Sequence, residues 1–353
     1  MISETLTDEM VSAHQQQTLA NGILRWSSGD GITECALPGV HLIRADQPTA
    51  TCNPTVYEPS IAFLIQGRKT VHLGDREIVY HELSYLTTSV ALPVLGHVVE
   101  ASPEKPYLAI KLKFTPQEVA DMILQAQINE PMETGPLCNC GLQVAAMEPD
   151  LLDALTRLLG LLERPGDVPV LGPLIRKEIL YRVLMGELGF SIRKFAMVDH
   201  QASRVSKVTA LIKERFTEPM RVRELAEAVN MSESALFRSF KDVTRMSPLQ
   251  YQKRLRLYEA RRLMLSEGLD AATASFRVGY ESPSHFSREY SREFGDSPRS
   301  DVLRQRAEPT RLGIGLRWAG LRARAEPTRP EALRRLMNSF KVDGVTRALT
   351  RQL

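Results

Sequence analysis

The sequence has no run of apolar residues close to the roughly 20 that a helix needs to cross a bilayer. Its first residues, MISETLTDEM, are acidic, whereas a secretory signal starts with basic residues followed by an apolar stretch. Cysteine is scarce, at four in 353 residues, which is too few for a disulfide scaffold. These absences predict a cytoplasmic protein with no membrane partner and with its cysteines as free thiols.

Aromatic residues make up only 6% of the chain, against 25% charged and 43% apolar residues. This composition is typical of a soluble globular protein, and 353 residues suffice for about two domains. The net charge is −9 over residues 1–199, +6 over residues 200–306 and +6 over residues 307–353. An acidic first half and a basic second half favour a sensing or assembling part joined to a part that binds a polyanion.

Short β-branched and apolar runs, separated by turn residues, fill residues 36–114. They are IAFLIQ, KTVHL, EIVY, SYLTTSV and YLAIKLKF. Gly74-Asp75 between two of these runs is typical of a tight hairpin, because glycine adopts a positive φ without strain. Strands in close succession with no helix between them predict a small antiparallel barrel or sandwich.

Helical patterns begin at Thr115, where TPQE supplies an N-cap threonine, a proline in the first turn and a glutamate three residues after the cap. Apolar residues then recur at helical spacing over residues 151–162 and 174–184. Such stripes are far more often core or dimer faces than ligand sites. Residues 189–204 lose the periodicity and are expected to form a linker.

The most informative feature is an internal repeat with an offset of about 50 residues. LAEAVNMSESALFRSFKDVTRMSP at 225–248 aligns with ASFRVGYESPSHFSREYSREFGDSP at 274–298. Each copy predicts a short helix, a tight turn and a second helix with a capping serine. This is the pattern of a helix-turn-helix unit, whose second helix enters the major groove of DNA. The turns fall at Asn230 and Gly279, and the caps at Ser232 and Ser282.

These motifs resemble the C-terminal signature of the AraC/XylS family of bacterial transcription regulators, through NMSESALFRSFKDVT, SPLQYQKRLRLYEARRLM and VGYESPSHFSREYSREFGDSP. YEPSIAFLIQGRKTVHLGD and LPVLGHVVEASPEKPYLAIKL also resemble the cupin-like N-terminal domain of one branch of that family. The resemblance implies an α+β protein. An N-terminal cupin-like β-barrel with flanking helices would precede a C-terminal all-α domain, in which a linker helix joins two helix-turn-helix units.

The resemblance implies a sequence-specific transcription regulator, expected to be an effector-responsive activator. Its partners would be double-stranded DNA, a small-molecule effector of unknown identity and RNA polymerase, and it would form a homodimer through its N-terminal domain. An architectural DNA-binding protein without a ligand is the alternative. The expected segments are 1–29, an N-terminal segment; 30–188, the cupin-like effector-binding and dimerisation domain; 189–204, the linker; 205–306, the DNA-binding domain, with helix-turn-helix units at about 222–243 and 270–294; and 307–353, a basic and flexible extension.

Residues at i, i+3, i+4 and i+7 of each second helix share one side and can reach a groove together. Arg238 and Arg288 are the main candidates for base contacts, because the guanidinium fork matches O6 and N7 of guanine, and they align with an arginine that the family uses in this way. The competing interpretation is that both are ordinary solvated helix arginines. The further candidates are Ser234, Ser284 and His285 for base edges, and Ser232, Lys241, Ser282, Ser287 and Arg292 for phosphates.

Arg245 departs from the family pattern, because such proteins usually carry at this position the glycine found here at Gly295. A residue just beyond a helix end tends to need a positive φ. We therefore expect Arg245 to cost about 1 kcal/mol and to weaken the first helix-turn-helix unit.

Neither a metal site nor an enzyme active site is predicted, so we expect no cofactor. A cupin metal site needs His-x-His with a nearby glutamate, whereas His72, His81 and His97 are isolated in the sequence. Neither a glycine-rich phosphate loop nor a nucleophile elbow is present. A cupin-type metal enzyme fused to a DNA-binding domain is therefore the weakest alternative.

Cys138 and Cys140 flank one asparagine in a predicted loop between helices. Half of a zinc site is one interpretation, but the sequence offers no second cysteine pair and no nearby histidine. A redox or electrophile sensor is another, with Cys140 as the preferred thiol. The competing interpretation is a pair of inert thiols.

Overall fold

The computed structural model describes residues 2–50, 52–128, 140–197 and 201–307, all of which belong to one compact unit. The expected basic extension lies, from residue 308 on, outside this part of the chain. The sheet-rich N-terminal part contains α1 (Ile2–Trp26), β1 (Gly31–Glu34), β2 (Val40–Ala45), β3 (Asn53–Tyr57), β4 (Ser60–Gln66), β5 (Arg68–Leu73), β6 (Arg76–His81), β7 (Ser84–Thr88), β8 (Leu92–Glu100), β9 (Tyr107–Lys113), α2 (Pro116–Gln125), β10 (Leu142–Ala146), α3 (Pro149–Gly160), α4 (Val168–Met185) and α5 (Gly189–Ala196). The helical part contains α6 (Gln201–Arg215), α7 (Val222–Ala228), α8 (Glu233–Thr244), α9 (Pro248–Ser266), α10 (Ala271–Arg277), α11 (Pro283–Phe294) and α12 (Pro298–Ala307).

The strands form two antiparallel sheets, a six-stranded sheet in the order β1-β2-β9-β4-β7-β10 and a four-stranded sheet in the order β3-β8-β5-β6. The predicted hairpin joins β5 to β6, where Leu73 pairs with Arg76 and Gly74 has a φ of +66°. The α+β class is thus confirmed. Within the described residues the two sheets remain separate and are not hydrogen-bonded into one closed barrel.

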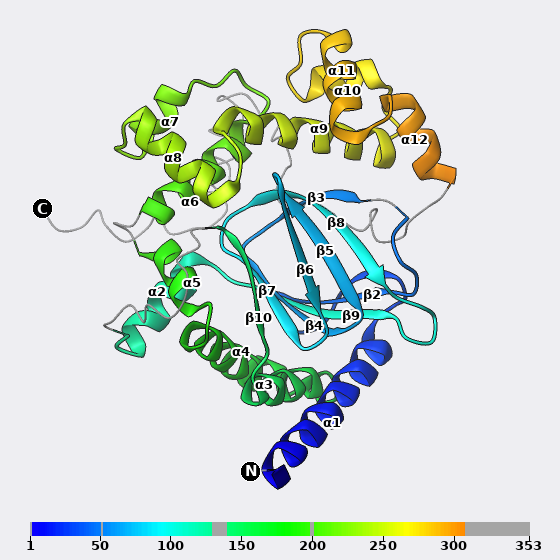
Figure 1. Cartoon of the computed structure of the whole chain (residues 1–353), viewed down its shortest axis with the longest axis vertical. Helices are drawn as coiled ribbons and strands as arrows, with labels where there is room; N and C mark the ends of the chain where they lie inside the picture. The colour runs from blue at the N-terminus through cyan, green and yellow to red at the C-terminus, as the bar shows by residue number, and fades with distance from the viewer. Residues whose placement is uncertain (1, 51, 129–139, 198–200, 308–353) are drawn as a thin grey trace, which may run out of the picture. The chain divides into compact units, whose positions relative to one another are not determined.

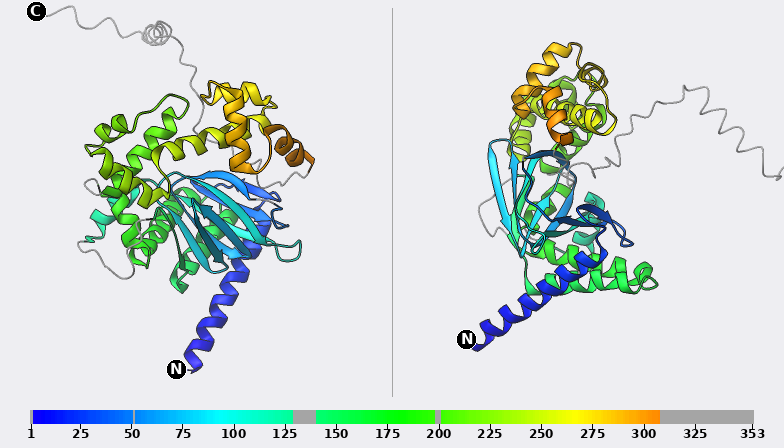
Figure 2. Two further views of the ribbon diagram at one scale, coloured as in Figure 1. Left: turned by 45° about the horizontal axis from the view of Figure 1, so that its top comes forward. Right: turned by 90° about the vertical axis from the view of Figure 1, so that its right-hand side faces the viewer.

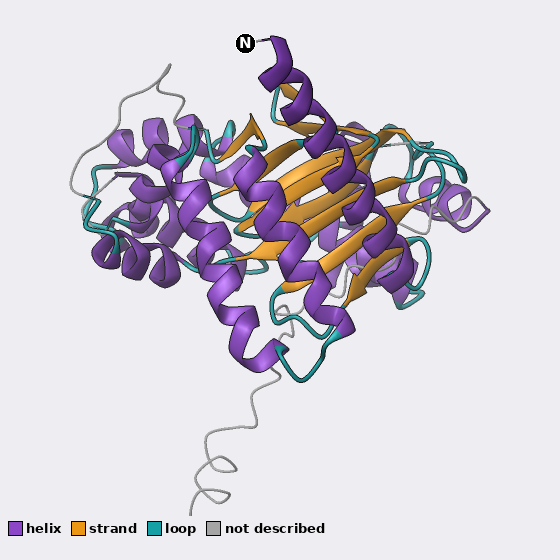
Figure 3. Ribbon diagram, turned by 90° about the horizontal axis from the view of Figure 1, so that it is seen from below, coloured by secondary structure: helices purple, strands orange, loops and turns teal. Residues whose placement is uncertain are grey.

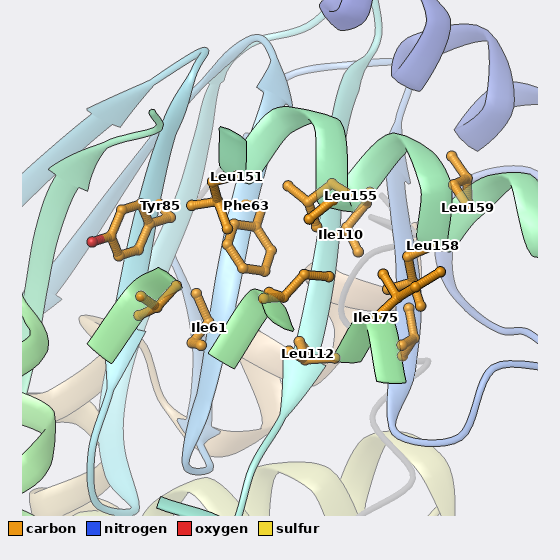
Figure 4. Packing of buried hydrophobic residues seen from close by; sticks show 14 of the residues in the cluster. Ile61, Phe63, Tyr85, Ile110, Leu112, Leu151, Leu155, Leu158, Leu159 and Ile175 are labelled. Atoms are coloured by element: carbon orange, nitrogen blue, oxygen red, sulfur yellow. The ribbon is translucent and has the colours of Figure 1, made fainter. Parts of the chain in front are cut away.

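The main core lies between one face of the six-stranded sheet and three helices, α1, α3 and α4 (Figure 3). Alternate residues of a strand share a face, so Ile61 and Phe63 of β4 both point toward these helices, as does Ile110 of β9 (Figure 4). Leu155 of α3 packs against them and is only 1% exposed. The leucine stripe is therefore core, as predicted, and each such side chain stabilises the fold by about 1.5–3 kcal/mol.

The N-terminal segment, 1–29, contains the long helix α1, whose second half lies on the sheet. Leu19 and Ile23, four residues apart on one helix face, are both fully buried there. The first turns of α1 extend away from the sheet (Figure 2). None of the described helices is both long and apolar enough to cross a membrane.

Helix α2 begins with the predicted capping box. The Thr115 hydroxyl accepts a hydrogen bond from the Glu118 amide at 3.1 Å, and the Glu118 carboxylate accepts one from the Thr115 amide at 2.7 Å. Pro116 occupies the first position of the helix, where the missing amide hydrogen is not needed.

Residues 189–204, expected to be a linker, instead contain α5 and the first turn of α6, with residues 198–200 outside the described chain. Ile192 and Phe195 of α5 are buried, at 1% and 4% exposure. Gly189 starts this helix where a Cβ atom would lie 1.9 Å from the Leu184 carbonyl oxygen. The helix is too short for a repeated apolar period, which is why its sequence resembles a linker.

Candidate nucleic-acid interface

Two pairs of short helices repeat the same local geometry. The turn between α7 and α8 has Asn230 at a φ of +53°, and the turn between α10 and α11 has Gly279 at +87°. Both turns are where the sequence predicts them, because asparagine and glycine tolerate positive φ better than other residues. At Gly279 there is also no room for a side chain, since a Cβ atom would lie 2.0 Å from the Thr217 carbonyl oxygen.

The second helix of each pair is capped by the predicted serine. The Ser232 hydroxyl accepts a hydrogen bond from the Ala235 amide at 3.2 Å, and the Ser282 hydroxyl accepts one from the His285 amide at 3.3 Å. Both serines are exposed. The positive end of each helix dipole therefore faces solvent, where a phosphate group can approach it.

The second helix of each pair has one buried face and one exposed face. Leu236 and Phe240 of α8, and Phe286 and Tyr290 of α11, are fully buried. The predicted contact residues lie on the remaining surface of these helices. The exposed ones are Ser234, Arg238, Lys241, Ser284, His285, Arg288 and Arg292, and Ser287 is half-buried.

Arg238 and Arg288, the predicted base contacts, differ in their ion pairing from most basic side chains around them. Arg223, Arg262 and Arg277 each form an ion pair with a glutamate, at 2.8–2.9 Å. Among the described residues, however, no carboxylate lies within ion-pair distance of Arg238 or Arg288. Their guanidinium donors are therefore available to a partner outside the protein. Two of the predicted phosphate contacts, Lys241 and Arg292, share this property.

His285 has neighbours within the protein. Its Nε2 atom lies 3.9 Å from a carboxylate oxygen of Glu289, and its ring lies against Tyr280 with centroids 5.8 Å apart. The ring is nevertheless exposed at the first turn of α11. Its predicted contact with a base edge stays a prediction.

Helix α9 runs between the α7–α8 pair and the α10–α11 pair (Figure 1). Its 19 residues span about 28 Å at about 1.5 Å per residue. Arg256, in the middle of α9, donates hydrogen bonds to the carbonyl oxygens of Phe216 at 2.6 Å and Gly279 at 3.0 Å. These bonds connect the end of α6 to the turn of the second pair, so Arg256 positions the two units relative to each other.

The C-terminal end of α9 is fixed by a buried ion pair. Arg261 donates two hydrogen bonds to the Asp301 carboxylate, both at 2.7 Å, and the Tyr290 hydroxyl of α11 donates a third at 2.6 Å. Burial by itself would raise the pKa of Asp301, but the hydrogen bonds and charge of Arg261 outweigh it and hold that pKa below its ordinary value. Sequence patterns missed this arrangement, because its members are up to 40 residues apart.

The residues after α8 and α11 adopt the predicted left-handed conformation. Arg245 has a φ of 59° and Gly295 a φ of 80°, and each ends its helix. The expected strain at Arg245 therefore has a structural basis, since an L-residue with a Cβ atom adopts this region at a cost.

Replacing Arg245 with glycine is expected to stabilise the protein by about 0.5–1 kcal/mol, because glycine removes that strain. Urea unfolding of the full chain measures the change. The matched control is Gly295→Ala, where a Cβ atom would meet nothing within 4 Å and only the backbone conformation matters. That control should destabilise by a similar amount. A loss of stability in Arg245→Gly would show that the contacts of the arginine side chain outweigh the strain.

Cys140 is buried, at 1% exposure, and Cys138 lies outside the described residues. The sensor interpretation stays a prediction, and it requires a local opening before an electrophile can reach the thiol. The thiols of Cys35 and Cys52 are partly buried, and burial raises the pKa of both. Less thiolate is therefore present at neutral pH for reaction.

The three histidines considered as metal ligands, His72, His81 and His97, come from three different strands, β5, β6 and β8. His97 makes a contact of 3.1 Å with the Thr49 hydroxyl, while His72 and His81 lie on β5 and β6. In the described ranges, no group of three or more histidine, cysteine, aspartate or glutamate side chains is arranged to hold a metal ion.

Together, these features define a two-part protein in which a sheet-rich domain precedes a helical domain with paired helix-turn-helix units. Comparison with protein families agrees. A family model of the AraC-type transcriptional regulator N-terminus matches residues 36–190, and a model of the helix-turn-helix domain matches residues 225–304. The chain belongs to the AraC family of transcription regulators, as its motifs predict.

Similar proteins include the HTH-type transcriptional activator RhaS of Salmonella arizonae, which is 31% identical over 148 residues, covering 42% of this chain and 53% of RhaS. The chain spans about half the length of the curated relatives it matches. Among solved structures, apo ToxT of Vibrio cholerae aligns with a TM-score of 0.49 at 10% identity, over 78% of this chain and 98% of ToxT. A regulator with an AraC-type DNA-binding domain from Chromobacterium violaceum aligns with a TM-score of 0.29 at 29% identity, over 30% of this chain and 95% of the other.

Proposed function

We propose that the chain is a sequence-specific transcription activator that reads two adjacent major grooves with α8 and α11. The observation that carries this proposal is the equivalence of Arg238 and Arg288. Both are exposed, both are without a carboxylate partner in the described chain, and both lie on the second helix of a helix-turn-helix unit. Each can donate two hydrogen bonds to one guanine.

The remaining predicted residues extend this contact surface. Those beside the arginines reach base edges, and those at the helix starts and outer rims hold the phosphate backbone, which positions the protein without reading sequence. The base-edge residues are Ser234, Ser284 and His285, and the phosphate residues are Ser232, Lys241, Ser282, Ser287 and Arg292.

The proposal assigns regulation to residues 30–188, which bind a small-molecule effector and form a homodimer, and DNA binding to residues 205–306. It places the protein in the cytoplasm, where it contacts RNA polymerase and has no catalytic activity. Support for activation, as opposed to repression, comes from the relatives named as activators. A reporter gene behind the bound promoter tests the direction of regulation.

Footprinting with the full chain tests the DNA-binding proposal. We expect two protected major-groove segments on one face of the duplex, about 34 Å apart, because α9 separates the two units by a similar length. Arg238→Ala should weaken protection of one segment and Arg288→Ala protection of the other. Arg277→Ala is the control, since this exposed arginine already pairs with Glu267. Protection of one segment only would refute the bipartite interpretation.

An architectural DNA-binding protein without a ligand is the second candidate. It predicts the same footprint but no response of DNA binding or transcription to any small molecule. A cavity between the two sheets, described below, favours the regulator.

A further inference from the structure

A cavity of about 90 Å³ lies inside the sheet-rich domain and is lined by strands of both sheets. Along the strands of the six-stranded sheet, residues that line the cavity alternate with residues of the main core. The cavity therefore lies on the face of this sheet that is opposite to α1, α3 and α4. Tyr107 and Lys111 of β9 line the cavity, whereas Leu108 and Ile110 between them belong to the core. The polar side chains of its wall include Tyr57, Lys69, Tyr80, Tyr107 and Lys111.

Two lysines from different sheets point into this cavity. Lys69 of β5 shares its strand face with Val71, and Lys111 of β9 shares its face with Ala109. Val71 and Ala109 are fully buried, so this face of each strand points inward. Lysine is seldom placed at such a position without a partner, because an ammonium group loses its hydration there.

The aromatic side chains around the two ammonium groups are neutral partners. The Lys69 Nζ atom lies 5.6 Å from the ring centres of both Tyr57 and Tyr107, and the Lys111 Nζ atom lies 5.9 Å from that of Tyr57. In the part of the chain that the structure describes, no carboxylate lies within ion-pair distance of either ammonium. Lys69 also forms a side-chain hydrogen bond with Tyr57, so phenol groups, and no carboxylate among the described residues, are the partners of the two cations.

The lowered pKa of Lys111 is consistent with a cation that has no carboxylate beside it in the described chain. Burial, together with the charges of Lys113 and Lys69, lowers the pKa of Lys111 to about 8, against a weaker opposing effect of Glu58. A bound anion would offset both the lost hydration and the repulsion between the lysines.

A larger surface groove, of about 480 Å³, lies beside α2 and α4 and is less suited to an ion. Its charged residues include Glu118 and Arg176, which form an ion pair with each other at 2.8 Å. Their charges are thus already matched, in contrast to those of Lys69 and Lys111.

We propose that the cavity binds a small organic carboxylate, with its carboxylate group between Lys69 and Lys111 and its apolar body against the tyrosine rings. This inference rests on the proposed function in one respect, that the carboxylate is the effector of the regulator. A volume of about 90 Å³ has room for several water molecules. We therefore expect the ligand to be a monocarboxylate of on the order of ten non-hydrogen atoms.

Calorimetric titration of the full chain, without DNA, tests the site. The probes are butyrate and benzoate, and the controls are butyramide and benzamide, which have the same shape without the charge. We expect the acids to bind and the amides to bind at least tenfold more weakly. Equal binding of acid and amide would overturn the proposal, and so would the absence of binding by both acids at millimolar concentration.

Variants of Lys69 and Lys111 then test whether these two side chains bind the carboxylate. Lys69→Met and Lys111→Met should each weaken binding of the acid at least tenfold, while Lys105→Met, an exposed lysine paired with Glu82, should leave it unchanged. Unchanged affinity in both cavity variants would contradict the assignment. If a variant does not fold, the melting temperature of the unaltered protein, measured with the acid and with the amide, still tests carboxylate binding. Only the acid should raise the melting temperature.

The two proposals can fail separately. Carboxylate binding without a DNA footprint would leave the site standing and remove the proposed function. A footprint with two protected segments, together with no carboxylate binding, would leave DNA recognition standing and remove this site. If both hold, adding the bound acid to the footprinting reaction should change the affinity for DNA, and an unchanged affinity would show that the carboxylate is not the effector.

Discussion

Replacing Asp301 with asparagine is expected to destabilise the helical domain by about 3–5 kcal/mol. Asp301 is fully buried, and the side chain of its partner Arg261 is only 7% exposed. The substitution keeps the size of the side chain but removes its charge, which leaves the guanidinium buried without a counter-ion. It also weakens the bond from Tyr290, which fixes α11 to this pair. The second helix-turn-helix unit should therefore lose its attachment to α9.

Urea unfolding of the full chain measures this loss. The matched control is Glu227→Gln, because Glu227 forms an ion pair of 2.8 Å with Arg223 that is exposed to solvent. Surface pairs of this kind contribute about 0–1 kcal/mol, so the control should remain close to the unaltered protein. Similar losses in the two variants would show that burial of the Arg261–Asp301 pair is not what stabilises the domain.

The same pair predicts a pH dependence of stability. The pKa of Asp301 in the folded protein lies below its ordinary value of about 3.9. The unfolded chain therefore takes up a proton at this group before the folded chain does. The contribution of Asp301 is fully present above the unfolded pKa and is lost as the pH falls through the lower, folded pKa. Asp301→Asn should abolish this part of the acid sensitivity, and an unchanged acid profile would contradict the assignment.

The features that could be predicted from the sequence are mainly local. A serine cap, an asparagine or glycine turn and a left-handed residue at a helix end depend on a few neighbouring residues. Ser232, Gly279 and Arg245 therefore have the conformations that their motifs predict. Because the repeat contains each of these signals twice, it also predicted two units of the same kind.

The features that the sequence did not predict depend on distant contacts. Nothing near Arg261 in the chain indicates that it pairs with Asp301, which approaches it only when α12 packs against α9. The cavity had a signal that could have been found. In KTVHL, alternation places Lys69 on the same strand face as Val71 and Leu73. In YLAIKLKF it places Lys111 next to Ala109, although Lys113 is on that face as well. An inward lysine on a strand is thus an indication of a buried anion site.

Replacing Arg288 with alanine is expected to weaken binding to the cognate DNA site by about 1–3 kcal/mol, or roughly 5- to 150-fold, and to relax the preference at one base pair. The fold should not change, because Arg288 is exposed, makes no ion pair within the described chain and lies inside a helix that tolerates alanine. Arg292, one turn further along α11, is the matched comparison. As a phosphate contact, Arg292→Ala should weaken binding uniformly across sequences and reduce the slope of log affinity against log salt by about 0.9. Binding measured on the cognate site, on single-base variants and at several salt concentrations separates the two roles. A uniform loss in Arg288→Ala would assign this arginine to phosphate and would leave α11 without its proposed guanine contact.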